Sequence, residues 1–130
     1  MARRLSKLGD GVKNFKPEFK KSADFLVGFF GGQVFETRGK IIGEPWKTRT
    51  KAYPWPILER SGKMRRSFKG KAKRLDAAIY NAMDYFKFHQ SKAPRRKLPR
   101  RIMMKLDEAR KTKIVHIFHE GLWKRVRKTT

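Results

Sequence analysis

The stretch MRRSFKGKAKRLDAAIYNA, residues 64–82, decides the fold because it predicts two strands joined by a tight connection. Its first half carries Met64, Phe68 and Ala72 within a basic frame. Its second half places side chains on one face of a strand at Leu75, Ala77, Ile79 and Asn81. A short connection at residues 72–74 allows antiparallel pairing, so we expect a small antiparallel sheet here.

A helical pattern precedes this pair of strands. Pro17 is a favoured first-turn residue, and apolar side chains then recur every three or four positions, which predicts one buried helix face. These positions are Phe19, Ala23, Leu26, Phe30 and Val34. Upstream, residues 1–14 are basic and predict an N-terminal arm or a short helix, because Gly9 and Gly11 weaken helix formation.

A second helix closes the chain. Asp107 and Glu108 suit its first turn, because acidic groups complement the positive end of the helix dipole. Its apolar stripe consists of Ala109, Val115, Phe118, Leu122 and Val126, with Ile114 and Ile117 beside it. The expected fold class is therefore α+β. We expect a small single domain over residues 15–130, with an N-terminal helix, a long loop, a short antiparallel sheet and a C-terminal helix packed on the sheet.

The segments between the strands and the closing helix are less regular. Residues 83–90, MDYFKFHQ, predict either more strand or a single helical turn. Residues 91–99, SKAPRRKLP, predict a cationic loop broken by two prolines. Residues 100–105, RRIMMK, predict a short strand with Ile102 and Met104 as its apolar side chains.

Residues 38–57, RGKIIGEPWKTRTKAYPWPI, predict a long loop, because three prolines, two glycines and no sustained period argue against a helix or strand. Long loops in compact domains are often functional. Trp46, Tyr53 and Trp55 are its candidate interface residues, since large aromatic side chains anchor protein interfaces. Two other roles remain open, namely stacking on nucleic-acid bases and attachment of the loop to its own domain.

Charge dominates the composition, because 35 Lys and Arg against 11 Asp and Glu give a net charge of +24 at pH 7. A field of this size attracts nucleic acid, acidic protein surfaces or anionic membranes. The candidate contacts to nucleic acid or to an acidic partner are Arg65, Arg66, Arg95, Arg96, Lys97, Arg100 and Arg101. These basic runs lack a zinc-finger spacing or an RNA-recognition aromatic motif, which predicts nonspecific phosphate contact.

Signals for catalysis, metal binding and membrane insertion are missing from the sequence. The chain has no cysteine, which excludes disulfides and thiolate metal sites. His116 and His119 share a helix face but lack the further ligands that zinc needs. The apolar window FLVGFF, residues 25–30, is too short to span a bilayer, and the N-terminus lacks a signal-peptide pattern. We therefore predict a cytoplasmically made non-enzyme with no catalytic residue, metal, cofactor or membrane partner.

Two motifs have a structural role that physical chemistry explains. Ser61 and Gly62 predict a turn, because glycine accepts the positive φ that a tight turn needs. His89 and Gln90 offer polar side chains at the end of an element, where they can tie down a neighbouring loop.

Four ordered blocks carry a family resemblance. They are Trp46 in the loop, ILERSGKMRRSF at residues 57–68, DYFKFHQ at residues 84–90 and LPRRIMM at residues 98–104, followed by the closing helix. With these blocks, the stretch from Trp46 to Val126 resembles the phage virion-morphogenesis, or tail-completion, family. Ser91-Lys92 stands where that family has a glycine after the His-Gln pair.

The resemblance implies a small α+β structural protein of the phage head–tail junction, of the tail-completion, neck or tail-terminator type. It implies a ring of six copies or a multiple, contacts with other neck and tail proteins, and DNA passing nonspecifically through the lumen. The implied location is the virion, and the host cytoplasm during assembly. The alternative function is a free basic protein that binds DNA or RNA nonspecifically. Oligomeric state separates the two, because only the first requires a ring.

Overall fold

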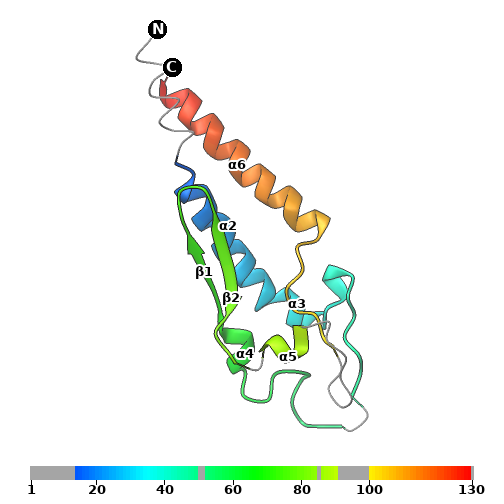
Figure 1. Cartoon of the computed structure of the whole chain (residues 1–130). Coiled ribbons are helices and arrows are strands. Elements are labelled where there is room, and N and C mark those ends of the chain that lie inside the picture. The colour runs from blue at the N-terminus through cyan, green and yellow to red at the C-terminus, as the bar shows by residue number, and fades with distance from the viewer. Residues whose placement is uncertain (1–13, 50–51, 85, 91–99, 130) are drawn as a thin grey trace. The chain divides into compact units, whose positions relative to one another are not determined.

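The computed structural model describes residues 14–49, 52–84, 86–90 and 100–129. Its elements in chain order are α2 (Lys16–Phe30), α3 (Gln33–Glu36), the 3-10 helix η1 (Lys40–Ile42), α4 (Lys63–Arg66), β1 (Phe68–Ala72), β2 (Ala77–Asn81), α5 (Phe86–Gln90) and α6 (Glu108–Thr129). β1 and β2 form a two-stranded antiparallel sheet (Figure 1). The predicted α+β class is confirmed. The predicted N-terminal arm lies outside the described residues except for Asn14.

Two compact units make up the chain. The terminal unit comprises Met1–Leu26, Gly70–Ile79 and Glu108–Thr130, and the central unit comprises Val27–Lys69 and Tyr80–Asp107. The single domain over residues 15–130 stays a prediction. Because α2 and the hairpin contribute residues to both units, their apolar periodicity gives no sign of the division.

The β1–β2 hairpin closes through a two-residue loop. Lys73 N donates to Asp76 O at 2.8 Å, which leaves residues 74–75 at the tip. At the other end, Ala82 N donates to Ser67 O at 2.9 Å, so the pairing continues beyond the strands. The tight connection predicted from the sequence is confirmed, with its centre slightly later in the chain.

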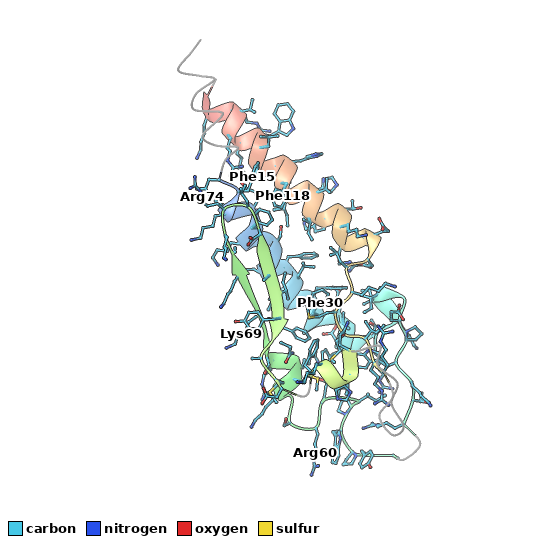
Figure 2. The ribbon with its side chains drawn as sticks, in the orientation of Figure 1. Phe15, Phe30, Arg60, Lys69, Arg74 and Phe118 are labelled. Carbon is cyan, nitrogen blue, oxygen red and sulfur yellow. The ribbon has the colours of Figure 1, made fainter. Side chains whose placement is uncertain are left out.

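The start of α2 is fixed by two hydrogen bonds. Asn14 Oδ1 accepts from Lys16 N at 3.2 Å, the geometry of a side chain that caps a helix N-terminus. Phe15 N donates to Arg74 O at 2.9 Å, which attaches the hairpin tip to the beginning of the helix. Figure 2 shows Arg74, Phe15 and Phe118 close together at this end of the terminal unit.

The first turns of α2 pack against α6 in the terminal unit (Figure 1). The Phe118 ring of α6 lies 5.6 Å from the Phe15 ring and 4.9 Å from the Phe19 ring, between centroids. Beside these rings, Arg125 Nη2 lies 2.7 Å from Glu18 Oε2, with side chains 17% and 9% exposed. A buried carboxylate is costly without a partner, so this ion pair fixes the helices against each other.

An aromatic cluster forms the core of the central unit. The Phe68 ring lies 6.1 Å from Phe30, 6.2 Å from Phe35 and 5.6 Å from Phe86, between ring centroids. Phe35 in turn meets Trp46 edge to face at 5.2 Å. Such pairs contribute about 0.5–1.5 kcal/mol each beyond their buried area, so the cluster supplies much of the cohesion of this unit.

Arg65 of α4 binds the segment that follows α2. Arg65 Nε donates to Gly31 O at 2.6 Å, and its guanidinium pairs with Glu59 at 2.7 Å and with Glu36 at 3.4 Å. The guanidinium also lies 5.7 Å from the centroid of the Phe35 ring. A Cβ at position 31 would lie 2.7 Å from the Arg65 carbonyl oxygen. Glycine at this position therefore allows the two backbones to approach.

The strand expected from residue 64 onward begins later than predicted. Gly62 has φ 72°, and the four residues that follow it form α4 rather than strand. Met64 and Phe68 are both buried, and their spacing of four is the spacing of one helix face. The residues before Phe68 thus follow the helical period, which explains the error.

The strand expected at residues 100–105 is absent from the structure, where this segment has no regular secondary structure. Met103 is completely buried, whereas Ile102 and Met104 are only half-buried. The backbone of this segment bonds to the Gln90 side chain and to the His89 carbonyl in α5 rather than to a neighbouring strand. For residues 83–90 the sequence left strand or a helical turn open, and residues 86–90 form the helix α5.

Gly28 and Gly31 give a direct test of the close approach at Arg65. A Cβ at Gly28, within α2, meets nothing within 4 Å. We predict that Gly28→Ala raises the free energy of unfolding by about 0.5–1 kcal/mol, because alanine favours a helix interior. Gly31→Ala should lower it by about 1–3 kcal/mol, because the backbones must move apart. Urea unfolding followed by circular dichroism measures both changes. Equal effects of the two substitutions would contradict the close contact between the backbones at Gly31 and Arg65.

Candidate interface site

Two stacked aromatic rings lie between two arginines in the loop between η1 and α4. The rings of Tyr53 and Trp55 stack with centroids 5.1 Å apart and an interplanar angle of 26°. The Arg49 guanidinium lies 5.4 Å from the Tyr53 centroid, and the Arg60 guanidinium lies 5.0 Å from the Trp55 centroid. Arg49 Nη2 also donates to Trp55 O at 2.8 Å. We call this series, Arg49, Tyr53, Trp55 and Arg60, the arginine–aromatic ladder.

The ladder lies on the surface of the central unit. Tyr53 is 43% exposed, Arg60 is exposed, and Arg49 and Trp55 are half-buried. Each cation over a ring contributes about 0.5–1 kcal/mol at exposed sites, so the four side chains hold one another in place before any partner binds. Tyr, Trp and Arg are also the residue types that dominate the energy of protein interfaces. The ladder is therefore an ordered group of these residue types on the surface of the central unit.

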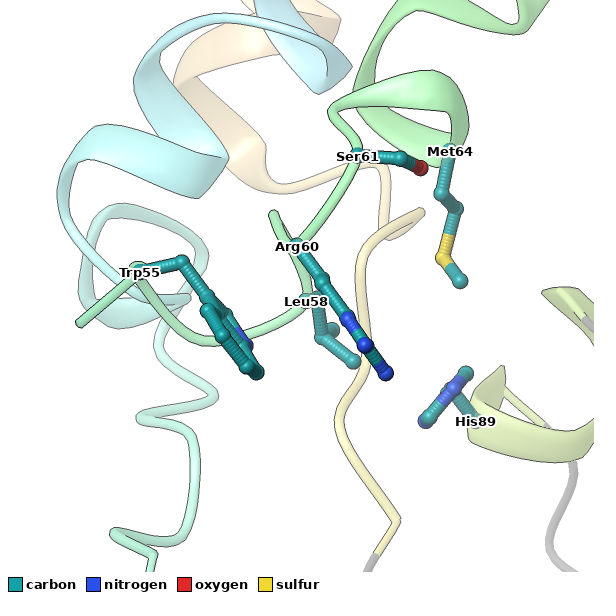
Figure 3. A pocket seen from close by; sticks show the side chains of 6 residues that line it. All are labelled: Trp55, Leu58, Arg60, Ser61, Met64 and His89. Atoms are coloured by element: carbon teal, nitrogen blue, oxygen red, sulfur yellow. The ribbon is translucent and has the colours of Figure 1, made fainter. Parts of the chain in front are cut away.

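A pocket of about 170 Å³ opens beside the ladder. Its lining consists of Trp55, Leu58, Arg60, Ser61, Met64 and His89. In Figure 3 the side chains of Trp55 and Arg60 come from the loop before α4, and that of His89 comes from α5; all three line the pocket. Leu58 has φ 64°, a conformation that costs a residue other than glycine about 1–3 kcal/mol. The backbone at the rim of this pocket is therefore strained at Leu58.

Gln90, at the end of α5, fixes the segment that follows the undescribed residues 91–99. Gln90 Oε1 accepts from Met103 N at 2.9 Å and from Met104 N at 3.2 Å. Gln90 Nε2 donates to Met104 O at 2.8 Å. The backbone adds a fourth bond, because Arg101 N donates to His89 O at 3.0 Å. The amide side chain thus satisfies backbone groups that a neighbouring strand would satisfy in a sheet.

The same segment is tied to the long loop by Arg101 and Trp46. Arg101 Nε and Nη2 donate to Lys47 O at 3.0 and 2.9 Å. Trp46 Nε1 donates to Ile102 O at 2.7 Å. Burial, followed by the like charge of Arg49, lowers the pKa of Arg101 from its ordinary value. The pairing of residues 46–47 with residues 101–102 therefore holds the loop at the point from which the ladder extends.

The structure places the three candidate interface residues in different environments. Tyr53 and Trp55 lie on the surface in the ladder, whereas Trp46 is only 6% exposed and packs on Phe35. Trp46 therefore attaches the loop to its own unit, which was the alternative left open by the sequence. Its assignment as an interface anchor is corrected, because a buried ring cannot face a partner.

The candidate contacts to nucleic acid or to an acidic partner also lie in different environments. Arg101 is buried and binds an acceptor inside the central unit, so its assignment as a partner contact is corrected. Arg65 also binds acceptors inside this unit, with its side chain 29% exposed, and its contact with a partner stays a prediction. Arg66 and Arg100 are exposed, although Arg66 Nη2 donates to Ser61 O at 3.2 Å and Arg100 Nε donates to Gln90 O at 3.1 Å. Arg95, Arg96 and Lys97 lie outside the described residues.

The structure describes all four residues of the predicted structural motif, Ser61, Gly62, His89 and Gln90. Gly62 adopts the positive φ of a turn, and Ser61 lies at the rim of the pocket. His89 is buried and, through its carbonyl, holds residue 101. Arg60 is absent from the residues predicted from the sequence, because its place in the ladder depends on the ring of Trp55 five residues earlier. An arginine at short spacing from a loop tryptophan was the only available signal.

The described residues provide no group of three His, Asp or Glu side chains arranged to hold a metal ion. None of the helices among them has an apolar stretch long enough to cross a bilayer. Comparisons of the chain with protein-family models, characterised proteins and solved structures find no match. The function must therefore be argued from the ladder, the pocket and the contacts that hold them.

Gln90→Ala tests whether the side-chain bonds of Gln90 hold residues 103–104. Three hydrogen bonds are lost, each worth about 0.5–1.5 kcal/mol net, so we predict a decrease of roughly 2 kcal/mol in the free energy of unfolding. Amide hydrogen exchange at Met103 and Met104 should accelerate. Gln33→Ala is the matched control, since Gln33 is exposed and its loss should change stability by less than about 0.5 kcal/mol. Unchanged exchange at Met103 in Gln90→Ala would contradict this role.

Proposed function

We propose that the chain is a structural protein of a bacteriophage virion that acts at the head–tail junction as a tail-completion, neck or tail-terminator subunit. It assembles into a ring of six copies or a multiple and contacts other neck and tail proteins. It acts through protein–protein contacts rather than catalysis. Its location is the virion, and the host cytoplasm during assembly.

One observation carries this proposal, namely that the four blocks with the family resemblance meet within the central unit. Trp46, from the first block, bonds to Ile102 in the last. Gln90, which ends the third block, bonds to Met103 and Met104. Residues 57–68 supply the pocket rim and the ring of Phe68. The four blocks that resemble the family therefore lie in one structural unit. This supports the proposal that they belong together as the motifs of one family.

The arginine–aromatic ladder supports a role in assembly. Its rings are fixed by stacking and by flanking guanidinium groups, so binding costs little side-chain entropy. The pocket beside it places Arg60 and His89 where an acidic or polar side chain of a neighbour would enter. We assign the ladder and the pocket to the contact with a neighbouring neck or tail subunit.

The net charge of +24 supports an acidic or DNA-containing setting. Like charge opposes free self-association of the purified chain. The ring therefore forms on an acidic connector or tail surface rather than spontaneously, and DNA that passes through its lumen is bound nonspecifically.

The alternative is a free basic protein that binds DNA or RNA nonspecifically. The observation that favours it is a run of exposed cations on the hairpin, formed by Lys69, Lys71, Lys73 and Arg74. Such a protein would act as a monomer, and the logarithm of its affinity would fall linearly with the logarithm of salt concentration. A head–tail subunit differs from it by forming a closed ring on its partner.

Complementation tests the proposal in particles produced from the genome that encodes this chain. Trp55→Ala and Arg60→Glu should each reduce the yield of infectious particles more than about tenfold, because truncated interface anchors commonly cost 2 kcal/mol or more. Mass spectrometry of purified wild-type particles should detect the chain. Urea unfolding of each purified variant shows whether its fold is retained.

Leu75→Ala is the control, because Leu75 is 70% exposed at the hairpin tip and takes no part in the ladder. Its yield should equal that of the wild type. Complete infectious particles that lack the chain would refute the proposal. Normal yield from both ladder variants would remove the ladder from the interface.

A further inference from the structure

A pocket of about 180 Å³ in the terminal unit is lined by side chains of α2 and α6. The two α2 residues are one helical turn apart, and the four α6 residues follow the spacing of one helix face. Two of the lining side chains are apolar and four are ionisable. The lining consists of Lys21, Phe25, Lys113, His116, Ile117 and Glu120. We call these six residues the lysine pocket.

The basic side chains of the lysine pocket are not paired within the fold. No hydrogen bond or ion pair joins the side chains of Lys21, Lys113 and His116 to any residue that the structure describes. Lys20, which precedes Lys21 in α2, instead pairs with Asp24 at 3.3 Å. Two ammonium groups and an imidazole therefore line one pocket with their side-chain donors unused.

The walls and the size of the pocket favour a small anion. Phe25 is half-buried and Ile117 is 7% exposed, so apolar side chains border the charged groups. Cations beside walls of low dielectric constant focus the electric field and raise the local concentration of anions. The volume lies below the roughly 300–1,000 Å³ of pockets for drug-sized ligands. A single phosphate group therefore fits this pocket better than a whole cofactor does.

Glu120 limits how strongly the pocket holds an anion. With His116 neutral, the two ammonium groups exceed the one carboxylate, so the lining keeps a net positive charge. The carboxylate repels a bound anion, and one phosphate alone should bind weakly. Strong binding therefore requires a ligand that makes several ionic contacts at once.

The surroundings of the pocket favour a polymer of phosphates. In every segment of the terminal unit that the structure describes, basic side chains outnumber acidic ones. A nucleic-acid backbone carries a negative charge at each nucleotide, so its neighbouring phosphates would meet these further cations. Arginine is the usual partner of a carboxylate at an interface, whereas lysine commonly binds phosphate as a point charge. The lining has two lysines and no arginine.

We propose that the lysine pocket binds a backbone phosphate of nucleic acid. Lys21 donates to the phosphate from α2 and Lys113 from α6, and His116 supplies a further donor. This assigns residues to the nonspecific DNA contact proposed above and rests on that contact, but it requires neither the ring nor the family resemblance. Tests on the purified chain can therefore fail while the virion role holds, and the virion role can fail while they succeed.

Fluorescence anisotropy with a labelled DNA duplex compares two double variants of the full chain. Lys21→Gln with Lys113→Gln removes both ammonium groups of the pocket. Lys16→Gln with Lys124→Gln is the matched control, since it removes two exposed lysines from the same helices and changes the net charge equally. The pocket variant should bind about tenfold more weakly, with a salt dependence smaller by about one phosphate contact. The control should bind less than about threefold more weakly.

Glu120→Gln is an independent variant that should strengthen binding. Loss of the carboxylate removes its repulsion of the phosphate, so the duplex should bind about threefold more tightly. Asp76→Asn makes the same change in charge at an exposed residue of the hairpin and should have a smaller effect. No gain from Glu120→Gln would count against the pocket.

Histidine ring signals in NMR spectra locate the contact. His116 lines the pocket, whereas His119 of the same helix lines a different groove. The duplex should shift the ring signals of His116 and leave those of His119 unchanged. Inorganic phosphate should shift His116 only at far higher concentration. A methylphosphonate duplex, whose backbone is uncharged, should shift neither.

Four outcomes would overturn the inference. Equal weakening by the two double variants would make binding a property of the whole basic surface. Equal shifts at both histidines, or none at His116, would place the contact elsewhere. Inorganic phosphate as effective as the duplex would make the pocket a site for free phosphate. Tighter binding of a poly-glutamate of matched length, with the same shift at His116, would make an acidic protein the partner.

Discussion

The guanidinium of Arg65 is the contact on which the central unit depends. It bonds to the backbone at Gly31 just after α2, and it pairs with Glu36 at the end of α3 and with Glu59 in the long loop. The Glu59 pair is the most buried of these contacts, with side chains 15% and 29% exposed. Removing one partner of such a pair leaves a poorly solvated charge. Because Arg60 follows Glu59 directly, the same contact that joins α4 to α3 also places one end of the ladder.

Side-chain bonds to backbone hold the rest of the central unit, which has little regular structure. Gln90 replaces a neighbouring strand for residues 103–104, and Arg101 binds the Lys47 carbonyl. These bonds bring together segments far apart in sequence without requiring a larger sheet. The consequence is a loop whose base is fixed at Trp46, while its outer part presents stacked rings to the surface.

The two long helices, α2 and α6, and the hairpin could be predicted because their apolar periods of 3.6 and 2 are visible in the sequence. The irregular parts could not, because a loop residue depends on partners that are distant in the chain. Trp46 and Trp55 look alike in sequence, yet one bonds to Ile102 in the interior and the other stacks on Tyr53 at the surface. Similarly, Arg101 reads as one more cation in a basic run, and only its backbone acceptor shows that it is structural. The residues exposed in the ladder and the residues that hold the loop are therefore of the same types.

The most direct test of the structural role is a cryo-electron microscopy reconstruction of native particles from the genome that encodes this chain. We predict density for the chain as a closed ring at the head–tail junction, with Tyr53 and Trp55 against a neighbouring subunit. A reconstruction in which other proteins account for all density at the junction and along the tail would contradict it.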